Sequence, residues 1–249
     1  MKYSNHAVAI PTYNEHDNIE TLSRRIFAAA PGVHLYIVDD NSPDGTGNLV
    51  KILAQQKYPN LHLLARDKKD GLGRAYVYGF EKILTENSIT HVTMMDADLS
   101  HEPEVLPKMF EIANDYDLII GSRYIKGGSV TKKWEWWRKM LSFGANLYLS
   151  LIFHKGVRDW TTGYNTISCN LLHKIDLQSL DLSGYAFISS LKYHLIINGA
   201  RVKEVPIFFE ERNSGKSKMS GSIIKEGIIA PWRIITRGYG QRRTSPEKK

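Results

Sequence analysis

Cysteine is almost absent from this sequence of 249 residues, in which Cys169 is the only one. A single thiol excludes an intramolecular disulfide framework and a zinc site built from several cysteines. It is compatible with a reducing compartment. We expect Cys169 to be a small buried apolar side chain.

Long apolar runs are missing as well. The longest candidate, residues 145–153, contains Asn146. It falls well short of the about 20 apolar residues that cross a bilayer. No long apolar stretch precedes Pro11, so no signal peptide is predicted. The sequence therefore predicts a chain that can lie on a membrane surface and does not cross the bilayer unaided.

Two glycine motifs for nucleotide binding are incomplete. Gly45-Thr-Gly47 and Gly71-Leu-Gly73 both lack the third glycine of the dinucleotide fingerprint, because Val50 and Tyr76 stand at that position. No Gly-Lys-Ser or Gly-Lys-Thr phosphate loop occurs either. Dehydrogenase and P-loop nucleotidase functions are therefore disfavoured.

Positive charge is plentiful. The chain has 33 Lys and Arg residues against 26 Asp and Glu, a formal net charge of +7 at pH 7, and its apolar share of 42% is enough for a full core. Such a surface favours anionic partners. Nucleotides, lipid phosphates, acidic membranes and nucleic acids all qualify, and charge alone does not choose among them.

The first half alternates short apolar strands with helical segments. Strands are predicted at 6–10, 35–38, 61–65, 91–95 and 117–121, and helices at 19–30, 48–56, 71–84 and from Pro103 onward. This alternation predicts an α/β fold with a mostly parallel central sheet and helices on both faces. Ligands of such sheets bind beyond the carboxyl ends of the strands.

The second half is less regular. It predicts helices at 140–153 and 186–199, short strands within 157–168, a strand at 201–209, a polar basic loop at 210–221 and an amphipathic segment at 223–235. Residues 236–249 form a basic tail that we expect to be disordered. No linker divides the chain, so a single domain is predicted over residues 1–235.

Carboxylates follow two of the predicted strands. Asp96-Ala-Asp98 comes directly after the fourth strand and offers the hard oxygen ligands that Mg²⁺ or Mn²⁺ prefers. An isolated acidic turn or helix N-cap is the competing interpretation, and the position at the ligand edge of the sheet favours the metal. Asp39 and Asp40 follow the second strand. Two interpretations fit them equally well: an ordinary polar turn, or carboxylates that hydrogen-bond a base or a ribose.

Three tryptophans lie among cations in one short stretch. Trp134, Trp136 and Trp137 are interleaved with lysines and with Arg138. This pattern is typical of an interfacial membrane anchor. Core packing is the alternative for one of the rings, and stacking on RNA bases is another. The apolar segments that follow favour lipid over nucleic acid.

Several motifs, in order from about Val8 to about Ile224, resemble family 2 glycosyltransferases, and within that family the dolichol-phosphate (polyprenol-phosphate) mannose synthases. They are Ile10-Pro-Thr-Tyr-Asn-Glu15, Val38-Asp-Asp-Asn-Ser-Pro-Asp-Gly-Thr46, Gly71-Leu-Gly73, Asp96-Ala-Asp-Leu-Ser-His101, Gly121-Ser-Arg-Tyr124 and Gly215-Lys-Ser-Lys218. The resemblance implies a GT-A fold, with the nucleotide-sugar half at about residues 1–125 and the acceptor and membrane-interface half at about 126–235.

The resemblance also implies roles for individual residues. Nucleotide-sugar binding falls to Pro11, Tyr13, Glu15, Val38, Asp40, Asp96, Ala97, Asp98, Arg212 and Lys218. Asp96, Asp98 and Ser100 are implied metal ligands, and Arg123, Arg138 and Ser142 are implied to hold the acceptor phosphate. Asp98, Arg123, Arg138 and Arg212 are the implied catalytic residues.

The expected activity is an inverting transfer of mannose from GDP-mannose to dolichyl or polyprenyl phosphate, on the cytoplasmic side of a membrane, with Mg²⁺ or Mn²⁺. A small membrane anchor subunit is a further expected partner, and no nucleic acid is expected. Transfer of glucose or another sugar from a UDP- or GDP-sugar to undecaprenyl phosphate is the enzymatic alternative. A non-catalytic basic module that binds membrane or RNA is a second alternative. A nucleotidyltransferase on a similar fold is a third, disfavoured because the phosphate-binding glycine loop of such enzymes is missing near the N-terminus. Asn165 and Ile188 depart from residues common in the family.

Overall fold

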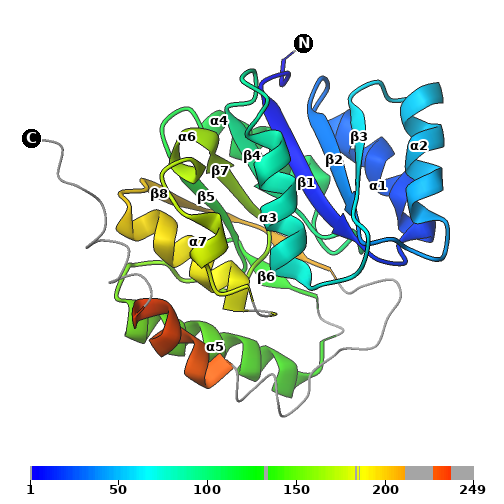
Figure 1. The fold of residues 1–249 in the computed structure, drawn as a ribbon. Coiled ribbons are helices and arrows are strands. Elements are labelled where there is room, and N and C mark those ends of the chain that lie inside the picture. The colour runs from blue at the N-terminus through cyan, green and yellow to red at the C-terminus, as the bar shows by residue number, and fades with distance from the viewer. Residues whose placement is uncertain (1, 132–133, 183, 185, 211–226, 237–249) are drawn as a thin grey trace, which may run out of the picture.

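The computed structural model of the chain describes residues 2–131, 134–182, 184, 186–210 and 227–236. A seven-stranded sheet in the order β3-β2-β1-β4-β7-β5-β8 lies between two layers of helices (Figure 1). The strands are β1 (His6–Thr12), β2 (His34–Asp39), β3 (Leu61–Ala65), β4 (His91–Met94), β5 (Leu118–Ser122), β7 (Asn165–Ser168) and β8 (Val202–Pro206). Two short strands, β6 (Ser129–Val130) and β9 (Phe208–Phe209), pair separately.

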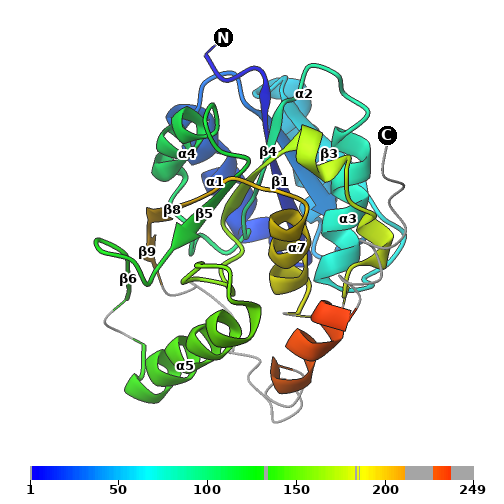
Figure 2. The same cartoon turned by 90° about the vertical axis from the view of Figure 1, so that its left-hand side faces the viewer.

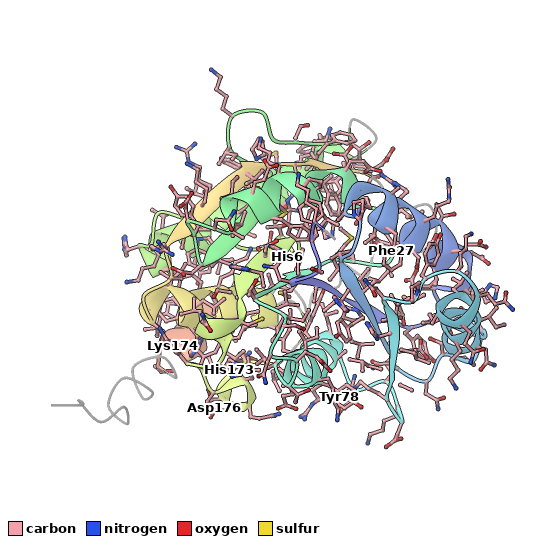
Figure 3. The ribbon with its side chains drawn as sticks, turned by 90° about the horizontal axis from the view of Figure 1, so that it is seen from above. His6, Phe27, Tyr78, His173, Lys174 and Asp176 are labelled. Atoms are coloured by element: carbon pink, nitrogen blue, oxygen red, sulfur yellow. The ribbon has the colours of Figure 1, made fainter. Side chains whose placement is uncertain are left out.

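The helices are α1 (His16–Ala29), α2 (Thr46–Gln56), α3 (Leu72–Ile83), α4 (Leu106–Ile112), α5 (Trp136–Phe153), α6 (Cys169–Leu172) and α7 (Ala186–Ile197). Two 3₁₀ turns, η1 (Pro103–Val105) and η2 (Leu177–Ser179), and a helix over residues 227–236 complete the described structure. Phe27 of α1 and Tyr78 of α3 lie on opposite sides of the sheet, as Figure 3 shows from above.

The prediction of a mostly parallel α/β sheet is confirmed. β1 pairs in parallel with β2 and β4, β2 with β3, and β5 with β8. β7 is the exception, because it runs antiparallel between β4 and β5. The sheet is buried on both faces, which explains the continuous apolar runs of β1 and β2.

Two predicted strands differ from the structure. The segment 157–168 forms only β7, since residues 157–164 are an irregular loop held by side-chain hydrogen bonds. The predicted strand 201–209 is two strands, β8 and β9, interrupted at Ile207. The break lets the chain leave β5 and pair with β6 instead. The predicted loop 210–221 and tail 236–249 lie almost wholly outside the described residues.

Parallel pairing gathers several chain segments at one edge of the sheet. Pro11 of β1 lies opposite Val38 of β2, and Ala9 lies opposite Met94 of β4. The residues that follow these strands therefore meet at the shared carboxyl edge. This edge carries the turns after Thr12, Asp39 and Met94.

α5 and the helix of residues 227–236 lie side by side below the sheet (Figure 2). Tyr148 joins them, because its hydroxyl donates to the carbonyl of Ile228 at 2.8 Å and accepts from Trp232 Nε1 at 3.3 Å. None of the helices in the described part of the chain combines the length and hydropathy needed to span a membrane.

Acid should destabilise the fold through His6, which is 6% exposed. Burial, followed by the charge of His91, lowers the pKa of His6 from 6.5 to about 4. The unfolded chain therefore binds this proton more readily, so stability is complete above about pH 6.5 and falls between pH 6.5 and 4. We expect His6 to account for about 1–2 kcal/mol of the unfolding free energy lost between pH 7.5 and 5. Urea unfolding followed by circular dichroism measures the loss.

His6→Gln should show a correspondingly smaller loss over that range. His173 is exposed and serves as the matched control, because His173→Gln makes the same chemical change at the surface instead of in the core. If the His6 variant and the natural protein lost the same unfolding free energy between pH 7.5 and 5, His6 would not contribute to the pH dependence.

Candidate active site

The turn after β1 is tied to the turn after β2. The backbone N–H groups of Asn14, Glu15 and His16 donate to the side chains of Ser42, Thr46 and Asp44, at 3.0, 3.1 and 3.0 Å. Asn14 and Asn41 both adopt positive φ, 61° and 56°, a region that asparagine tolerates better than most residues. The two turns therefore form one surface at the carboxyl edge of the sheet.

This surface carries the predicted nucleotide residues. The Tyr13 ring is 37% exposed, and Lys69 Nζ lies 3.8 Å from its centroid. Pro11 and Val38 lie on adjacent strands beneath it. An exposed aromatic face backed by a cation is suited to stacking on a base.

Asp39 and Asp40 have different roles in this surface. Asp39 Oδ1 accepts from the hydroxyls of Thr12 at 2.9 Å and Ser42 at 2.6 Å, so its carboxylate holds the turn together. Asp40 forms an ion pair with Arg66 Nη1 and is 6% exposed. Burial raises the pKa of Asp40, although the charge and hydrogen bond of Arg66 oppose the shift. Asp39 is thus occupied by the turn, whereas Asp40 is paired with Arg66, a partner that sequence reasoning missed.

The turn after β4 holds the predicted metal ligands Asp96, Asp98 and Ser100. Ser100 donates to Asp98 Oδ1 from its hydroxyl at 2.5 Å and from its N–H at 3.1 Å. Leu99, between them, has φ 63°. This backbone region is strained for a leucine and is found mostly at functional sites.

Among the described residues, no group of three or more His, Cys, Asp and Glu side chains is arranged to hold a metal. The turn therefore offers two carboxylates and a hydroxyl rather than a full set of protein ligands.

His101 supports this turn from below. Its Nδ1 accepts from the backbone N–H of Asp96 at 3.1 Å. Burial lowers the pKa of His101, so the ring is neutral at pH 7 and its proton lies on Nε2. Nε2 has no hydrogen-bond partner among the described residues and lies 4.0 Å from Asp96 Oδ2. The ring stacks on Tyr164, with centroids 4.9 Å apart.

Arg123, a predicted phosphate ligand, lies at the end of β5 and is 8% exposed. Its Nε and Nη2 both donate at 2.8 Å to the carboxylate of Asp159, and Nη2 also donates to Thr161 Oγ1 at 2.7 Å. Although burial opposes ionisation of both groups, their mutual attraction raises the pKa of Arg123 and lowers that of Asp159. The guanidinium is therefore fixed in place, with Nη1 left outside these bonds.

Lys192 is buried beneath this ion pair. Its ammonium donates to the carbonyls of Asp159 at 2.9 Å and Thr162 at 3.0 Å. Burial lowers its pKa to about 7. Sequence reasoning missed both Asp159 and Lys192. The usable signal was the charge of Lys192 in an otherwise apolar helical segment, because a buried lysine needs specific partners.

The other predicted acceptor residues, Ser142 and Arg138, lie on α5. The Tyr124 hydroxyl donates to Ser142 Oγ at 2.7 Å, and the Arg123 guanidinium lies 5.3 Å from the Tyr124 ring. Arg138, one turn earlier on α5, lies over the Trp134 ring at 5.1 Å. The structure thus brings Arg123 and Ser142 together across β5 and α5, and it places Arg138 on the same helix. Arg212 and Lys218 lie outside the described residues.

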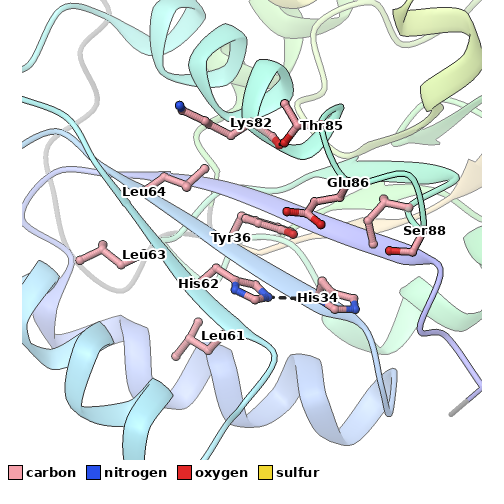
Figure 4. A pocket seen from close by; sticks show the side chains of 11 residues that line it. His34, Tyr36, Leu61, His62, Leu63, Leu64, Lys82, Thr85, Glu86 and Ser88 are labelled. Carbon is pink, nitrogen blue, oxygen red and sulfur yellow. Dashed lines mark hydrogen bonds between the residues drawn. The ribbon is translucent and has the colours of Figure 1, made fainter.

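A separate groove of about 500 Å³ opens between α3 and strands β2 and β3 (Figure 4). In it His34 Nδ1 and His62 Nε2 lie 3.2 Å apart, and His62 stacks on Tyr36. None of the predicted site residues that the structure describes lines this groove. The catalytic prediction therefore concerns the carboxyl edge of the sheet and not this hollow.

The fold is shared with solved structures of glucosyl-3-phosphoglycerate synthase from Mycobacterium tuberculosis. One of them, in complex with UDP, superposes with a TM-score of 0.66 over 94% of this chain and 80% of that chain, at 16% sequence identity. Another, with Mn²⁺, UDP-glucose and phosphoglyceric acid, superposes with a TM-score of 0.65 over 94% and 79%. The expectation of a GT-A fold is confirmed.

Sequence relatives are closer. The chain is 44% identical over 233 residues to polyprenol monophosphomannose synthase of Mycolicibacterium smegmatis, covering 92% of this chain and 87% of that protein. It is 39% identical to undecaprenyl-phosphate mannosyltransferase of Micrococcus luteus, covering 94% and 96%. Dolichol-phosphate mannosyltransferase of Saccharomyces cerevisiae is 31% identical, with 88% and 82% covered. Residues 7–179 match the family model described as glycosyl transferase family 2. The chain is thus a glycosyltransferase that belongs to glycosyl transferase family 2.

Proposed function

We propose that this protein transfers mannose from GDP-mannose to the phosphate of a polyprenyl or dolichyl lipid at a membrane surface, within a single domain over residues 1–235. One observation supports this most directly. The carboxylate turn at Asp96–Ser100 and the buried Arg123–Asp159 pair are joined through His101 and Phe209, in a chain 44% identical to a polyprenol monophosphomannose synthase. That arrangement suits a sugar donor and an anionic acceptor that must meet in line.

On the donor side, the turns around Tyr13 and Asp40 would hold the nucleotide. Asp96, Asp98 and Ser100 would hold Mg²⁺ or Mn²⁺, and several features support this fit. Their oxygens are hard ligands, and Ser100 orients Asp98. Gly163 also leaves room beside Asp96, because a Cβ there would lie 3.5 Å from Asp96 Oδ1. When bound, a divalent cation neutralises charge that develops on a leaving diphosphate. Arg212 and Lys218 are proposed to add positive charge to the same phosphates.

The acceptor needs positioning more than deprotonation. A phosphate monoester is already ionised at neutral pH, because its second pKa is about 6. Arg123 is well suited to hold such an anion, since Asp159 and Thr161 fix its guanidinium before the ligand arrives. Arg138 and Ser142 are proposed as the other contacts. Attack on the anomeric carbon from the side opposite the diphosphate would invert its configuration.

An exposed apolar face supports a location at a membrane surface. Along α5, Trp136, Met140, Phe143, Leu147 and Leu151 are between 51% and 72% exposed and recur at helical spacing. Ile228, Ile229 and Trp232 extend this face on the adjacent helix. Apolar faces of this extent commonly bind membranes or proteins. Arg138 and Ser142 lie on the same helix as this face, so the phosphate of a lipid anchored in the bilayer would be close to both.

The donor and acceptor are tested directly with the purified protein. Radiolabelled GDP-mannose and polyprenyl phosphate with Mn²⁺ should give a labelled lipid, whereas UDP-glucose should give at most trace product. EDTA should abolish transfer, because the leaving diphosphate then lacks its counter-charge. Efficient transfer from UDP-glucose would favour the glucosyl alternative. Binding of polyprenyl phosphate without any transfer would favour a non-catalytic module.

Asp98→Asn should lower kcat by about 10²–10³-fold, because the variant removes one charge from the proposed metal and phosphate site. The amide keeps an oxygen for the hydrogen bonds from Ser100, so the melting temperature should stay near that of the natural protein. Asp115→Asn, an exposed change beyond α4, is the control for charge. Full activity of the Asp98 variant would refute its assignment.

Replacing Leu147 and Leu151 together by Gln should weaken binding to vesicles of phosphatidylcholine and phosphatidylglycerol by about tenfold or more, because two apolar side chains no longer leave water. Co-sedimentation measures the bound fraction. Ile52→Gln is the matched control, since Ile52 is 48% exposed on α2. Unchanged sedimentation of the double variant would place the membrane contact elsewhere.

A further inference from the structure

The ring of Phe209 contacts groups from both sides of the site. It lies edge-on to His101, with centroids 5.5 Å apart and planes at 70°. It also lies edge-on to Trp134 at 5.6 Å and 71°, and the Arg123 guanidinium is 5.4 Å from its centroid. His101 supports Asp96 on the donor side, whereas Arg123 and Trp134 belong to the acceptor side.

The backbone at this point makes the same connection. The carbonyl of Phe209 accepts from the N–H of Thr131, in the segment that leads into α5, at 2.9 Å. The N–H of the next residue, Glu210, donates to the carbonyl of Ser100 at 3.2 Å. Phe209 is therefore hydrogen-bonded to the segment that leads into α5, and Glu210 is hydrogen-bonded to the turn that carries Ser100.

The neighbouring aromatic does not share these contacts. Phe208 precedes Phe209 in β9, and successive side chains of a strand point to opposite faces. Phe208 is 37% exposed, whereas the Phe209 ring lies among His101, Trp134 and Arg123. Any large apolar side chain would fill the space here. The edge-on and cation–π geometry, in contrast, requires an aromatic ring, because it depends on the ring quadrupole.

We propose that Phe209 is a positioning residue that sets the geometry of both ligand sites at once, orienting His101 and hence Asp96 for the donor diphosphate, and Arg123 and Trp134 for the acceptor phosphate. This inference rests on the proposed function. Loss of the ring weakens binding of both ligands, although the ring itself touches neither.

The test measures binding without turnover in the full-length protein. Isothermal titration calorimetry with GDP plus Mn²⁺ reports on the donor side, and titration with farnesyl phosphate reports on the acceptor side. Phe209→Leu should raise both dissociation constants by about three- to tenfold, which is the range expected for loss of an aromatic or cation–π contact. Phe209→Tyr keeps the ring and should change both by less than about twofold. Phe208→Leu, the control in the same strand, should change neither.

Each outcome decides the matter. A Phe209→Leu protein that melts like the control and binds both ligands normally, or loses only one of them, overturns the inference. If that variant does not fold, Phe209→Met takes its place with the same criteria. If the natural protein binds both ligands but does not transfer mannose, the proposed function is wrong. The binding data for the Phe209 variants then still decide whether Phe209 positions both sites. A natural protein that binds neither ligand contradicts both.

Discussion

The buried ion pair between Arg123 and Asp159 is the interaction on which the site depends. Asp159 accepts four hydrogen bonds, from the Nε, Nη2 and N–H of Arg123 and from the N–H of Thr162, while Lys192 holds its carbonyl. A buried pair of this kind adds little net stability, but loss of one partner leaves an uncompensated charge at a cost of about 3–5 kcal/mol. Arg123 keeps its charge beside this carboxylate, whereas burial lowers the pKa of Lys192 to about 7.

From that pair, contacts extend in two directions. Tyr124 and Ser142 connect it to α5, and Phe209 connects it to His101 and the carboxylate turn. The exposed apolar side chains lie on α5 and on residues 227–236, which run side by side (Figure 2).

Local patterns in the sequence predicted most of the first half of the fold. The apolar runs of β1, β2 and β3 and the helices between them were placed within a few residues, because each is a short regular element bounded by turn residues. The carboxyl-edge location of Asp40, Asp96 and Asp98 followed from parallel pairing. Long-range contacts were not predictable in this way. The charge of Lys192 in an apolar helix is a local signal of a buried lysine, but nothing local names its partner or indicates that Asp159 receives Arg123, since these partners are 33 and 36 residues apart.

The antiparallel strand β7 has a consequence for how the enzyme is assembled. It lies between β4, which leads to Asp96, and β5, which leads to Arg123, yet it follows both in the chain by more than 40 residues. A fragment that stopped near residue 125 would leave the edges of β4 and β5 unpaired and its sheet incomplete. Residues 1–125 are consequently not an interchangeable module. Recombination between relatives at that boundary would separate β4 and β5 from the strand that joins them.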